Sequence, residues 1–256
     1  MVNKSRRKFI KGIALTGAAS FFLPSIGTLA STSTSKYKQK AREGTIILFQ
    51  GDSITDGNRG RDKDPNHIMG HGYAFSIASR IGADYPEKRY VFYNRGISGN
   101  KVVDLENRWQ TDTLDLKPDV LSILVGVNDS TSVITNWEPL VSLEKYEEIY
   151  DRLLAQTKSV LPNVLFVLCE PFILKGSRVN DNWEAFQTDI HKRQKIVQKL
   201  AEKYHAVYVG FQDVFDKACE RAPFDYWIWD GVHPTVAGHE LMAREWIKKV
   251  EKRISF

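Results

Sequence analysis

The sequence predicts an α/β protein in which helices cover both faces of a central parallel sheet. Short, nearly continuous apolar runs recur along the chain, as is typical of strands buried on both faces. Longer segments with helical periodicity separate these runs, so strands and helices alternate. The composition, 42% hydrophobic and 26% charged over 256 residues, is that of an ordinary globular protein. We therefore expect one main domain built on five parallel strands.

Each expected element is placed by its residue pattern. The strands are the β-branched and aliphatic runs TIILF, RYVFYN, VLSILVGV, VLFVLCEP and HAVYVGF, which begin at residues 45, 89, 120, 164 and 205. The helices are the amphipathic stretches between and after these runs, at residues 73–85, 102–115, 143–161, 183–204 and 235–253.

The first 30 residues differ in kind from the rest. MVNKSRRKFIKG is basic without an acidic residue, and a moderately apolar run follows, as in a secretory signal peptide. A membrane anchor is the alternative, but Gly17, Pro24 and Gly27 interrupt the run, which leaves it short for about 30 Å of hydrocarbon. SRRKFIK resembles a twin-arginine export signal. We expect cleavage after Ala30 and a periplasmic or secreted protein with no lasting membrane anchor.

Removal of this segment changes the charge balance. Residues 1–30 contain five basic residues and no acidic one, so the formal charge falls from +5 to zero. The charge of the whole chain therefore gives no support for nucleic-acid binding. Residues 31–43 are polar and are expected to form a loose lead-in to a single domain over 44–256. Cys169 and Cys219 could pair in an oxidising compartment, but Cys169 ends an apolar run, where a buried free thiol is at least as compatible with the sequence, so the pairing stays open.

The polar residues after the apolar runs are the candidates for function, because ligands of an open parallel sheet bind beyond the carboxyl ends of its strands. These blocks are GDS at 51–53, RGISGN at 95–100, GVND at 126–129 and, near the C-terminus, DGVHP at 230–234. Together they supply a hydroxyl, amides beside glycines, a carboxamide, a carboxylate and an imidazole. That set matches the needs of acyl transfer.

Each candidate has a role in such a reaction. Ser53 is the expected nucleophile, His233 the base that accepts its proton, and Asp230 the carboxylate that orients the imidazole. The amides of Ser53 and Gly99 and the side-chain amide of Asn128 are the expected donors to the oxyanion.

Structural alternatives exist for the same residues. A Gly-Asp-Ser sequence after a strand is by itself more often a turn or a helix cap, which Asp52 and Asp56 would shape. Ser98 is a rival nucleophile because GISG half-matches G-x-S-x-G, but position 100 is asparagine. His233 could be a loop histidine bonded to its own surroundings. The four blocks, occurring in order at strand ends, favour the catalytic interpretation.

These blocks, GDSITDG, GISGN, GVND and DGVHP, resemble the four signature motifs of the GDSL/SGNH hydrolases. The resemblance implies a serine esterase or lipase on a flavodoxin-like, three-layer α/β/α sandwich. It assigns Ser53, Asp230 and His233 as the catalytic triad, with Ser53, Gly99 and Asn128 at the oxyanion hole. The leucine of the name-giving motif is replaced by isoleucine, which leaves the chemistry unchanged.

The flanks of the motifs, such as NRGISGNKVVDLENRW and WDGVHPTVAGHELMAREWI, resemble the acetylxylan esterases of this family, which deacetylate hemicellulose sugars. The resemblance implies that Trp229 shapes the acyl pocket. Tyr226 belongs to the same aromatic group, which could stack on a sugar or pack in the core. The polar loop with Asn58 and Arg59 is expected to border the active site and to contact substrate.

The sequence thus predicts a serine esterase that deacetylates an oligo- or polysaccharide through an acyl-enzyme on Ser53, without an organic cofactor. His67 and His71 match no metal-ligand spacing, so no metal is expected. Two alternatives stay open: a lysophospholipase or thioesterase with the same triad and a longer acyl slot, and a non-catalytic carbohydrate-binding module. A homo-oligomer is compatible with all of them.

Overall fold

The computed structural model describes residues 39–62 and 64–256, so the expected signal segment over 1–30 lies outside the described residues. A five-stranded sheet forms the centre, with every neighbouring pair parallel. The strand order β3-β2-β4-β5-β6 is the flavodoxin-like order. All five predicted strands are confirmed: β2 (Ile46–Gly51), β3 (Val91–Asn94), β4 (Val120–Leu124), β5 (Leu165–Cys169) and β6 (Val207–Val209).

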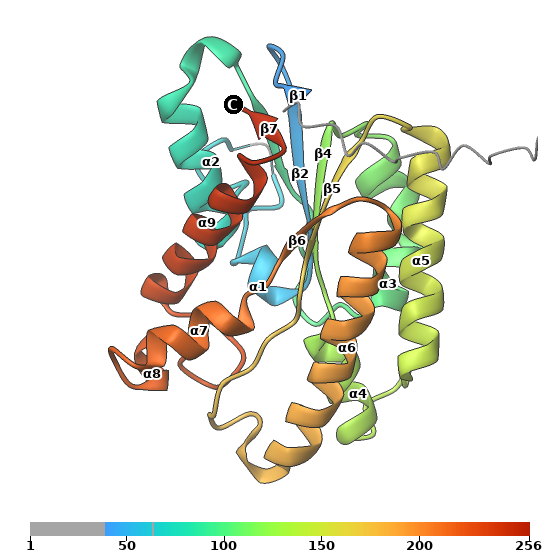
Figure 1. Ribbon diagram of the computed structural model, residues 1–256, viewed down its shortest axis with the longest axis vertical. Coiled ribbons are helices and arrows are strands. Elements are labelled where there is room, and N and C mark those ends of the chain that lie inside the picture. The colour runs from blue at the N-terminus through green and yellow to red at the C-terminus, as the bar shows by residue number, and fades with distance from the viewer. Residues whose placement is uncertain (1–38, 63) are drawn as a thin grey trace, which may run out of the picture. The chain divides into compact units, whose positions relative to one another are not determined.

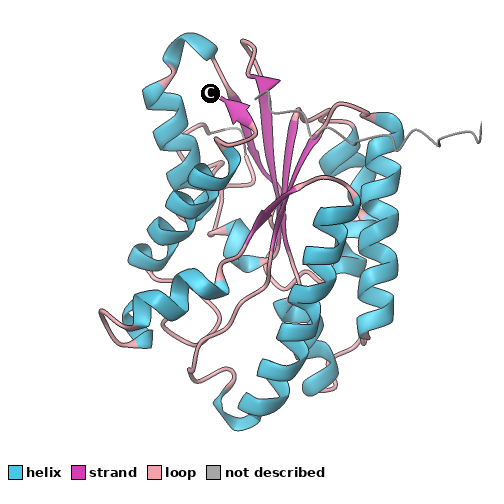
Figure 2. Ribbon diagram, viewed as in Figure 1, coloured by secondary structure: helices cyan, strands magenta, loops and turns pink. Residues whose placement is uncertain are grey.

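Helices cover both faces of the sheet, as predicted (Figure 1, Figure 2). Successive strand residues point to opposite faces: Ile47 and Phe49 join one hydrophobic core, whereas Leu48 joins the other. The first core packs against α2 (Tyr73–Asp84), α7 (Gln212–Cys219) and α9 (Val236–Val250). The second packs against α3 (Val102–Asn107), α5 (Leu143–Val160) and α6 (Trp183–Lys203).

The helix predicted over 102–115 is wrong as one continuous element. α3 ends at Asn107, and a π-helical turn, η2 (Gln110–Leu114), follows. The indole of Trp109 is buried between them, and Gln50 of β2 donates to the carbonyl of Asp112 at 2.8 Å. The interruption lies at Arg108, whose guanidinium donates to Oε1 of Gln50 at 2.8 Å and to the carbonyl of Arg95 at 2.7 Å, so tertiary contacts override the helical periodicity there.

Short helices that the sequence analysis did not predict follow two strands directly. α1 (Ser53–Asp56) begins after β2, and α4 (Val127–Ile134) begins after β4. The strand expected over 120–127 therefore ends at Leu124. A third short helix, α8 (Phe224–Trp227), precedes the loop that carries Asp230. Single turns η1 (Pro86–Lys88) and η3 (Asn180–Asn182) complete the helical elements of the described ranges.

The packed structure begins upstream of Gly44, where the domain was expected to start. β1 (Gln39–Lys40) pairs in parallel with β7 (Ile254–Ser255), and Ala41 is buried in the core. Cys169 and Cys219 are both free thiols. No helix in the described ranges combines the length and the apolar character that crossing a membrane requires.

Candidate active site

Three side chains meet beyond the carboxyl ends of the strands. The hydroxyl of Ser53, at the start of α1, lies 2.9 Å from Nε2 of His233, 180 positions along the chain. Nδ1 of the same imidazole lies 2.7 Å from Oδ2 of Asp230. An ionised carboxylate can only accept, so the proton is assigned to Nδ1, and Nε2 is left to accept the serine proton. The structure therefore brings the predicted serine, histidine and aspartate into one hydrogen-bonded chain.

The loop after α8 holds the carboxylate and the imidazole in register. Oδ1 of Asp230 accepts the amides of Val232 at 3.0 Å and His233 at 2.7 Å, while Oδ2 faces the imidazole. Burial raises the pKa of Asp230, but the hydrogen bonds from His233 and Val232 outweigh burial and bring it to about 2. The side chain thus stays ionised at neutral pH, as the orientation and stabilisation of an imidazolium require.

A second segment, after β5, clamps this loop. The amide of Leu174 donates to the carbonyl of Gly231, and that of Arg178 donates to the carbonyl of Asp230, each at 3.0 Å. A Cβ on Gly176 would lie 2.2 Å from the nitrogen of Gly231, so only glycine allows this approach. Nε of Arg178 then lies 2.8 Å from Oδ2 of Asp230. Sequence reasoning missed Arg178, because one basic residue in a polar segment carries no local signal.

The turn that carries Ser53 is shaped by its acidic neighbours, as expected. Asp52 caps α1 by accepting the amide of Ile54 at 3.0 Å, and burial raises the pKa of Asp52 to about 7. Asp56 accepts both the amide and the hydroxyl of Ser98 at 3.0 Å. The hydroxyl of Ser98, the rival nucleophile, is therefore committed to a carboxylate rather than to the imidazole.

The expected oxyanion donors border the same space as Ser53. The chain before Gly99 passes tightly over α1, since a Cβ on Gly96 would lie 2.3 Å from a backbone nitrogen of that helix. Among the described residues, no acceptor takes the amides of Ser53 and Gly99. Asn128, in the first turn of α4, donates from Nδ2 to the carbonyl of Asn100 at 3.1 Å, which leaves its second N–H available.

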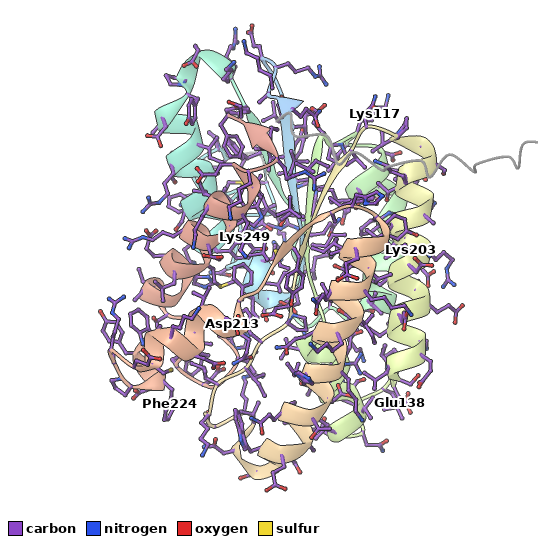
Figure 3. All side chains as sticks on the ribbon, viewed as in Figure 1. Lys117, Glu138, Lys203, Asp213, Phe224 and Lys249 are labelled. Atoms are coloured by element: carbon purple, nitrogen blue, oxygen red, sulfur yellow. The ribbon has the colours of Figure 1, made fainter. Side chains whose placement is uncertain are left out.

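These groups open onto a cavity of about 560 Å³, which we call the triad cavity. It lies between the loop after α4 and the segment after β5 that contains Arg178. In Figure 3, Glu138 and Phe224 are labelled on opposite sides of this end of the sheet. Besides Ser53, Ser98, Gly99, Asn128 and His233, its wall consists of Thr131, Thr135, Trp137, Arg178, Val179 and Val232. The wall is therefore mostly polar, with a single aromatic ring.

That ring, Trp137, is 42% exposed, and the buried Lys101 packs against one face of it. Nζ of Lys101 lies 4.3 Å from the centroid of the indole and donates to the carbonyls of Trp137, at 3.3 Å, and Pro139, at 2.9 Å. The buried ammonium is thereby satisfied, and the exposed face of the indole is kept in one orientation. The sequence analysis did not single out either residue, because they are 36 positions apart.

The four residues expected to contact substrate lie in different places. Trp229 is 62% exposed, and its ring stacks near the imidazole of His233 with 6.3 Å between centroids. Tyr226 is exposed on α8, and Asn58 is exposed in the loop after α1. Arg59 lines a separate cavity. None of the four lines the triad cavity, and Trp229 alone among them packs against a residue of the triad.

The histidines and aspartates of the polar loop do not converge. Nδ1 of His67 contacts Asp64 at 2.7 Å on the surface. His239, in α9, is buried and accepts the amide of Tyr73 at 3.1 Å. Within residues 39–62 and 64–256, no three side chains of the metal-binding types are grouped around a common point.

Comparison with known proteins identifies relatives over most of the chain. A sequence model of the GDSL-like Lipase/Acylhydrolase family matches residues 49–241. An acetylxylan esterase of Geobacillus stearothermophilus is 32% identical over 216 residues, which cover 82% of this chain and 96% of the esterase. A GDSL-like protein of Parabacteroides merdae is 40% identical, with a TM-score of 0.79 over 84% of this chain and 100% of that chain.

A crystal structure of the acetylxylan esterase from G. stearothermophilus matches with a TM-score of 0.74 at 32% identity, over 83% of this chain and 96% of that chain. Catalytic mutants of that esterase have also been crystallised. They replace a serine, an aspartate and a histidine, and the histidine stands three positions after the aspartate.

Proposed function

The chain belongs to the GDSL-like lipase/acylhydrolase family, and on that basis we propose that it is a serine esterase that removes acetyl groups from an oligo- or polysaccharide. The observation that carries this proposal is the hydrogen-bonded chain from Ser53 through His233 to Asp230, which opens onto a polar cavity. We place its site of action in the periplasm or outside the cell, on the strength of the twin-arginine-like N-terminus.

The reaction follows from the order of the hydrogen bonds. Nε2 of His233 takes the proton of Ser53 as Oγ attacks the acetyl carbonyl, and the carbonyl oxygen becomes an oxyanion. The amides of Ser53 and Gly99 and the free N–H of Asn128 stabilise that charge. Collapse expels the sugar alkoxide, which takes the proton from His233. Water, deprotonated by the same imidazole, then hydrolyses the acetyl-enzyme, and acetate leaves.

Asp230 supports the proton transfers through His233. Its ionised carboxylate orients the imidazole and stabilises the imidazolium, and it stays unprotonated because its pKa is about 2. The same division of roles is supported by the G. stearothermophilus relative, whose catalytic mutants replace the same three residue types with the same aspartate-to-histidine spacing as Asp230 and His233.

Two features favour an acetylated sugar over a long-chain acyl ester. The G. stearothermophilus relative, 96% of whose length this chain covers, is an acetylxylan esterase. The wall of the triad cavity carries hydroxyl, amide and guanidinium groups beside one aromatic face, a combination suited to a polyhydroxylated ring. A long acyl chain would instead call for a continuous apolar slot.

Acetate release from acetylated xylan, mannan, pectin and small sugar acetates tests the proposal, with Ser53→Ala as the control. A parallel series of p-nitrophenyl esters from acetate to palmitate separates an acetylesterase from a lysophospholipase or thioesterase. We expect a steep preference for acetate and loss of turnover in Ser53→Ala. A preference for palmitate would overturn the substrate class, whereas equal rates for Ser53→Ala and wild type would overturn the nucleophile.

A further inference from the structure

A second cavity, separate from the triad cavity, lies beside α1 and has a volume of about 400 Å³. Three arginines line it: Arg59 and Arg61 from the loop after α1, and Arg95 from the end of β3. We call it the arginine cavity. Guanidinium groups from two separate segments therefore face one space, with Ile68 as its apolar wall.

The arginines differ in how far carboxylates neutralise them. Arg61 is fully paired, because Nη1 and Nη2 contact the two oxygens of Asp56 at 3.0 and 2.7 Å. Nε of Arg95 lies 3.8 Å from Asp112, beyond hydrogen-bonding distance, and the other oxygen of Asp112 is taken by Arg108 at 3.0 Å.

The backbone amide of Arg59 donates to Asp56 at 3.2 Å, but its guanidinium has no carboxylate within 4.0 Å among the described residues. Its one side-chain hydrogen bond runs from Nε to the carbonyl of Gly96 at 3.0 Å, so both Nη groups are free. Asp62 also lines the cavity, but it is exposed and its Oδ1 accepts the amide of Asp64. Asp112 also lines the cavity, but Arg108 holds its other oxygen. Among the described residues, the cavity thus presents two guanidinium groups, those of Arg59 and Arg95, that no carboxylate hydrogen-bonds.

The local environment makes this positive charge costly. Burial lowers the pKa of Arg59 to about 10, and the neighbouring charges of Arg61 and Arg95 act in the same direction, against the attraction of Asp56. An anion bound in the cavity would relieve this repulsion. A carboxylate fits well, since a planar guanidinium can donate two parallel hydrogen bonds to its two oxygens.

The arginine cavity borders the segment that leads into the triad cavity. Gly96, which accepts from Arg59, stands three positions before Gly99 of the triad cavity. Asp56, which pairs with Arg61, holds Ser98 of the same wall. A glycan whose acetylated unit lies at Ser53 could therefore extend a further unit toward the arginines.

We propose that Arg59 and Arg95 form an anion subsite that binds the carboxylate of a uronic acid unit carried by the acetylated glycan. The part that concerns the glycan rests on the proposed function, whereas the anion site rests on the arginines alone. The enzyme then selects acetyl groups that lie near an acidic sugar over those on a neutral stretch of the same polymer.

Binding without turnover tests the subsite directly. Methyl β-D-glucuronide and methyl β-D-glucoside form a matched pair that differs in the carboxylate, and both can be titrated into the protein at fixed ionic strength by calorimetry or NMR. We expect the glucuronide to bind about tenfold more tightly, as charge-assisted pairs with one or two arginines allow. Equal binding of the two would overturn the subsite, and binding of sulfate without the glucuronide would overturn its assignment to a sugar carboxylate.

Variants of the two arginines locate the site. Arg95→Gln and Arg59→Gln should each remove most of the glucuronide preference, and Arg59→Lys should restore part of it. Arg89→Gln is the matched control, because the side chain of Arg89 is 78% exposed and its nearest carboxylate lies 3.9 Å away, as for a typical surface arginine. Unchanged glucuronide binding in both Arg95→Gln and Arg59→Gln would contradict the proposal.

Kinetics then separate the subsite from the proposed function. With acetylated oligosaccharides that either carry or lack a uronic acid, kcat/KM of the wild type should favour the acidic substrate about tenfold, and the ratio should approach one in Arg95→Gln. Failure of the subsite would appear as a ratio of one in the wild type with rapid turnover of both substrates. Failure of the proposed function would appear as no turnover of either, whatever the binding titration gives.

Discussion

Arg178 donates from Nε to Oδ2 of Asp230 at 2.8 Å, and this is the same oxygen that faces Nδ1 of His233 at 2.7 Å. The carboxylate that orients the imidazole is thus shared with a cation. Since 61% of the arginine side chain is exposed, solvent screens part of its effect. The guanidinium should still oppose the gain of a second positive charge on the imidazole.

Arg178→Gln should therefore move the acidic limb of the kcat/KM profile to higher pH. Without the guanidinium, no positive charge lies beside the carboxylate oxygen that Asp230 shares with the imidazole of His233. We expect a shift of about half a pH unit, as screening of an exposed charge allows. Arg178→Lys should keep the limb near its wild-type position. A lower kcat at every pH with an unmoved limb would assign Arg178 a structural role only.

Asn128→Ala should reduce kcat far more than it changes KM. In the proposed mechanism the side-chain amide donates to the charge that develops on the carbonyl oxygen, so its contribution belongs mainly to the transition state. The loss of one such donor typically costs about 10²-fold to 10³-fold in kcat. Steady-state kinetics on p-nitrophenyl acetate measure this change, and Thr135→Ala, at the wall of the same cavity, should have a much smaller effect on kcat. A rise in KM with unchanged kcat would remove Asn128 from the oxyanion hole.

Trp137→Ala should weaken the binding of sugar esters more than that of esters without a sugar. Its exposed indole face can stack on the pyranose ring of an acetylated sugar but has little to offer to ethyl acetate. We expect KM for acetylated xylotriose to rise about tenfold, as loss of one stacked aromatic implies, with little change for ethyl acetate. The KM of Trp137→Phe for acetylated xylotriose should lie between those of the wild type and Trp137→Ala. Trp183→Ala, in which a second lysine-stacked tryptophan is lost outside the triad cavity, is the control. Equal losses on both esters would argue against a sugar platform.

His239 should contribute a loss of stability on acidification, opposite in sign to the contribution of Asp52, whose raised pKa makes the folded state take up a proton first. Burial, the largest cause, and the nearby His71 and His233 lower its pKa to about 4, whereas an unfolded histidine titrates near 6.5. The unfolded chain therefore binds the extra proton between these values, so this stability is complete above pH 6.5 and is lost as pH falls toward 4. The loss reaches about 3 kcal/mol at pH 4.

Urea unfolding at pH 7 and pH 4.5 measures this effect. His239→Asn cannot titrate in this range, and its side chain can still accept the amide of Tyr73, so the change in its free energy of unfolding from pH 7 to pH 4.5 should be more favourable than that of the wild type. Equal changes in wild type and variant would show that other groups control the acid sensitivity.

The fold was predictable because its strands are buried on both faces. Such strands must be continuously apolar, and all five were found from that property alone. The segment over 102–115 was predicted incorrectly as one helix, because Arg108, where α3 ends, is held by Gln50 of the sheet and by the carbonyl of Arg95. The short helices α1 and α4 were missed because they start directly at the polar blocks, where propensity is weak and the neighbouring strands decide the conformation.

The residues of the candidate site likewise fall into those that the sequence predicts and those that only the structure reveals. The sequence by itself predicted Ser53, Gly99, Asn128, Asp230 and His233 as one site, because local motifs at strand ends mark them and parallel strands end at a common edge. Tertiary structure alone revealed Arg178 and Trp137 at the triad cavity and the convergence of Arg59 with Arg95 in a separate cavity. These side chains come from segments far apart along the chain; the close packing at Gly176 brings Arg178 to Asp230, and Lys101 holds Trp137. Contacts of that kind leave no periodicity or spacing in the sequence, since each depends on where the folded backbone places the loop.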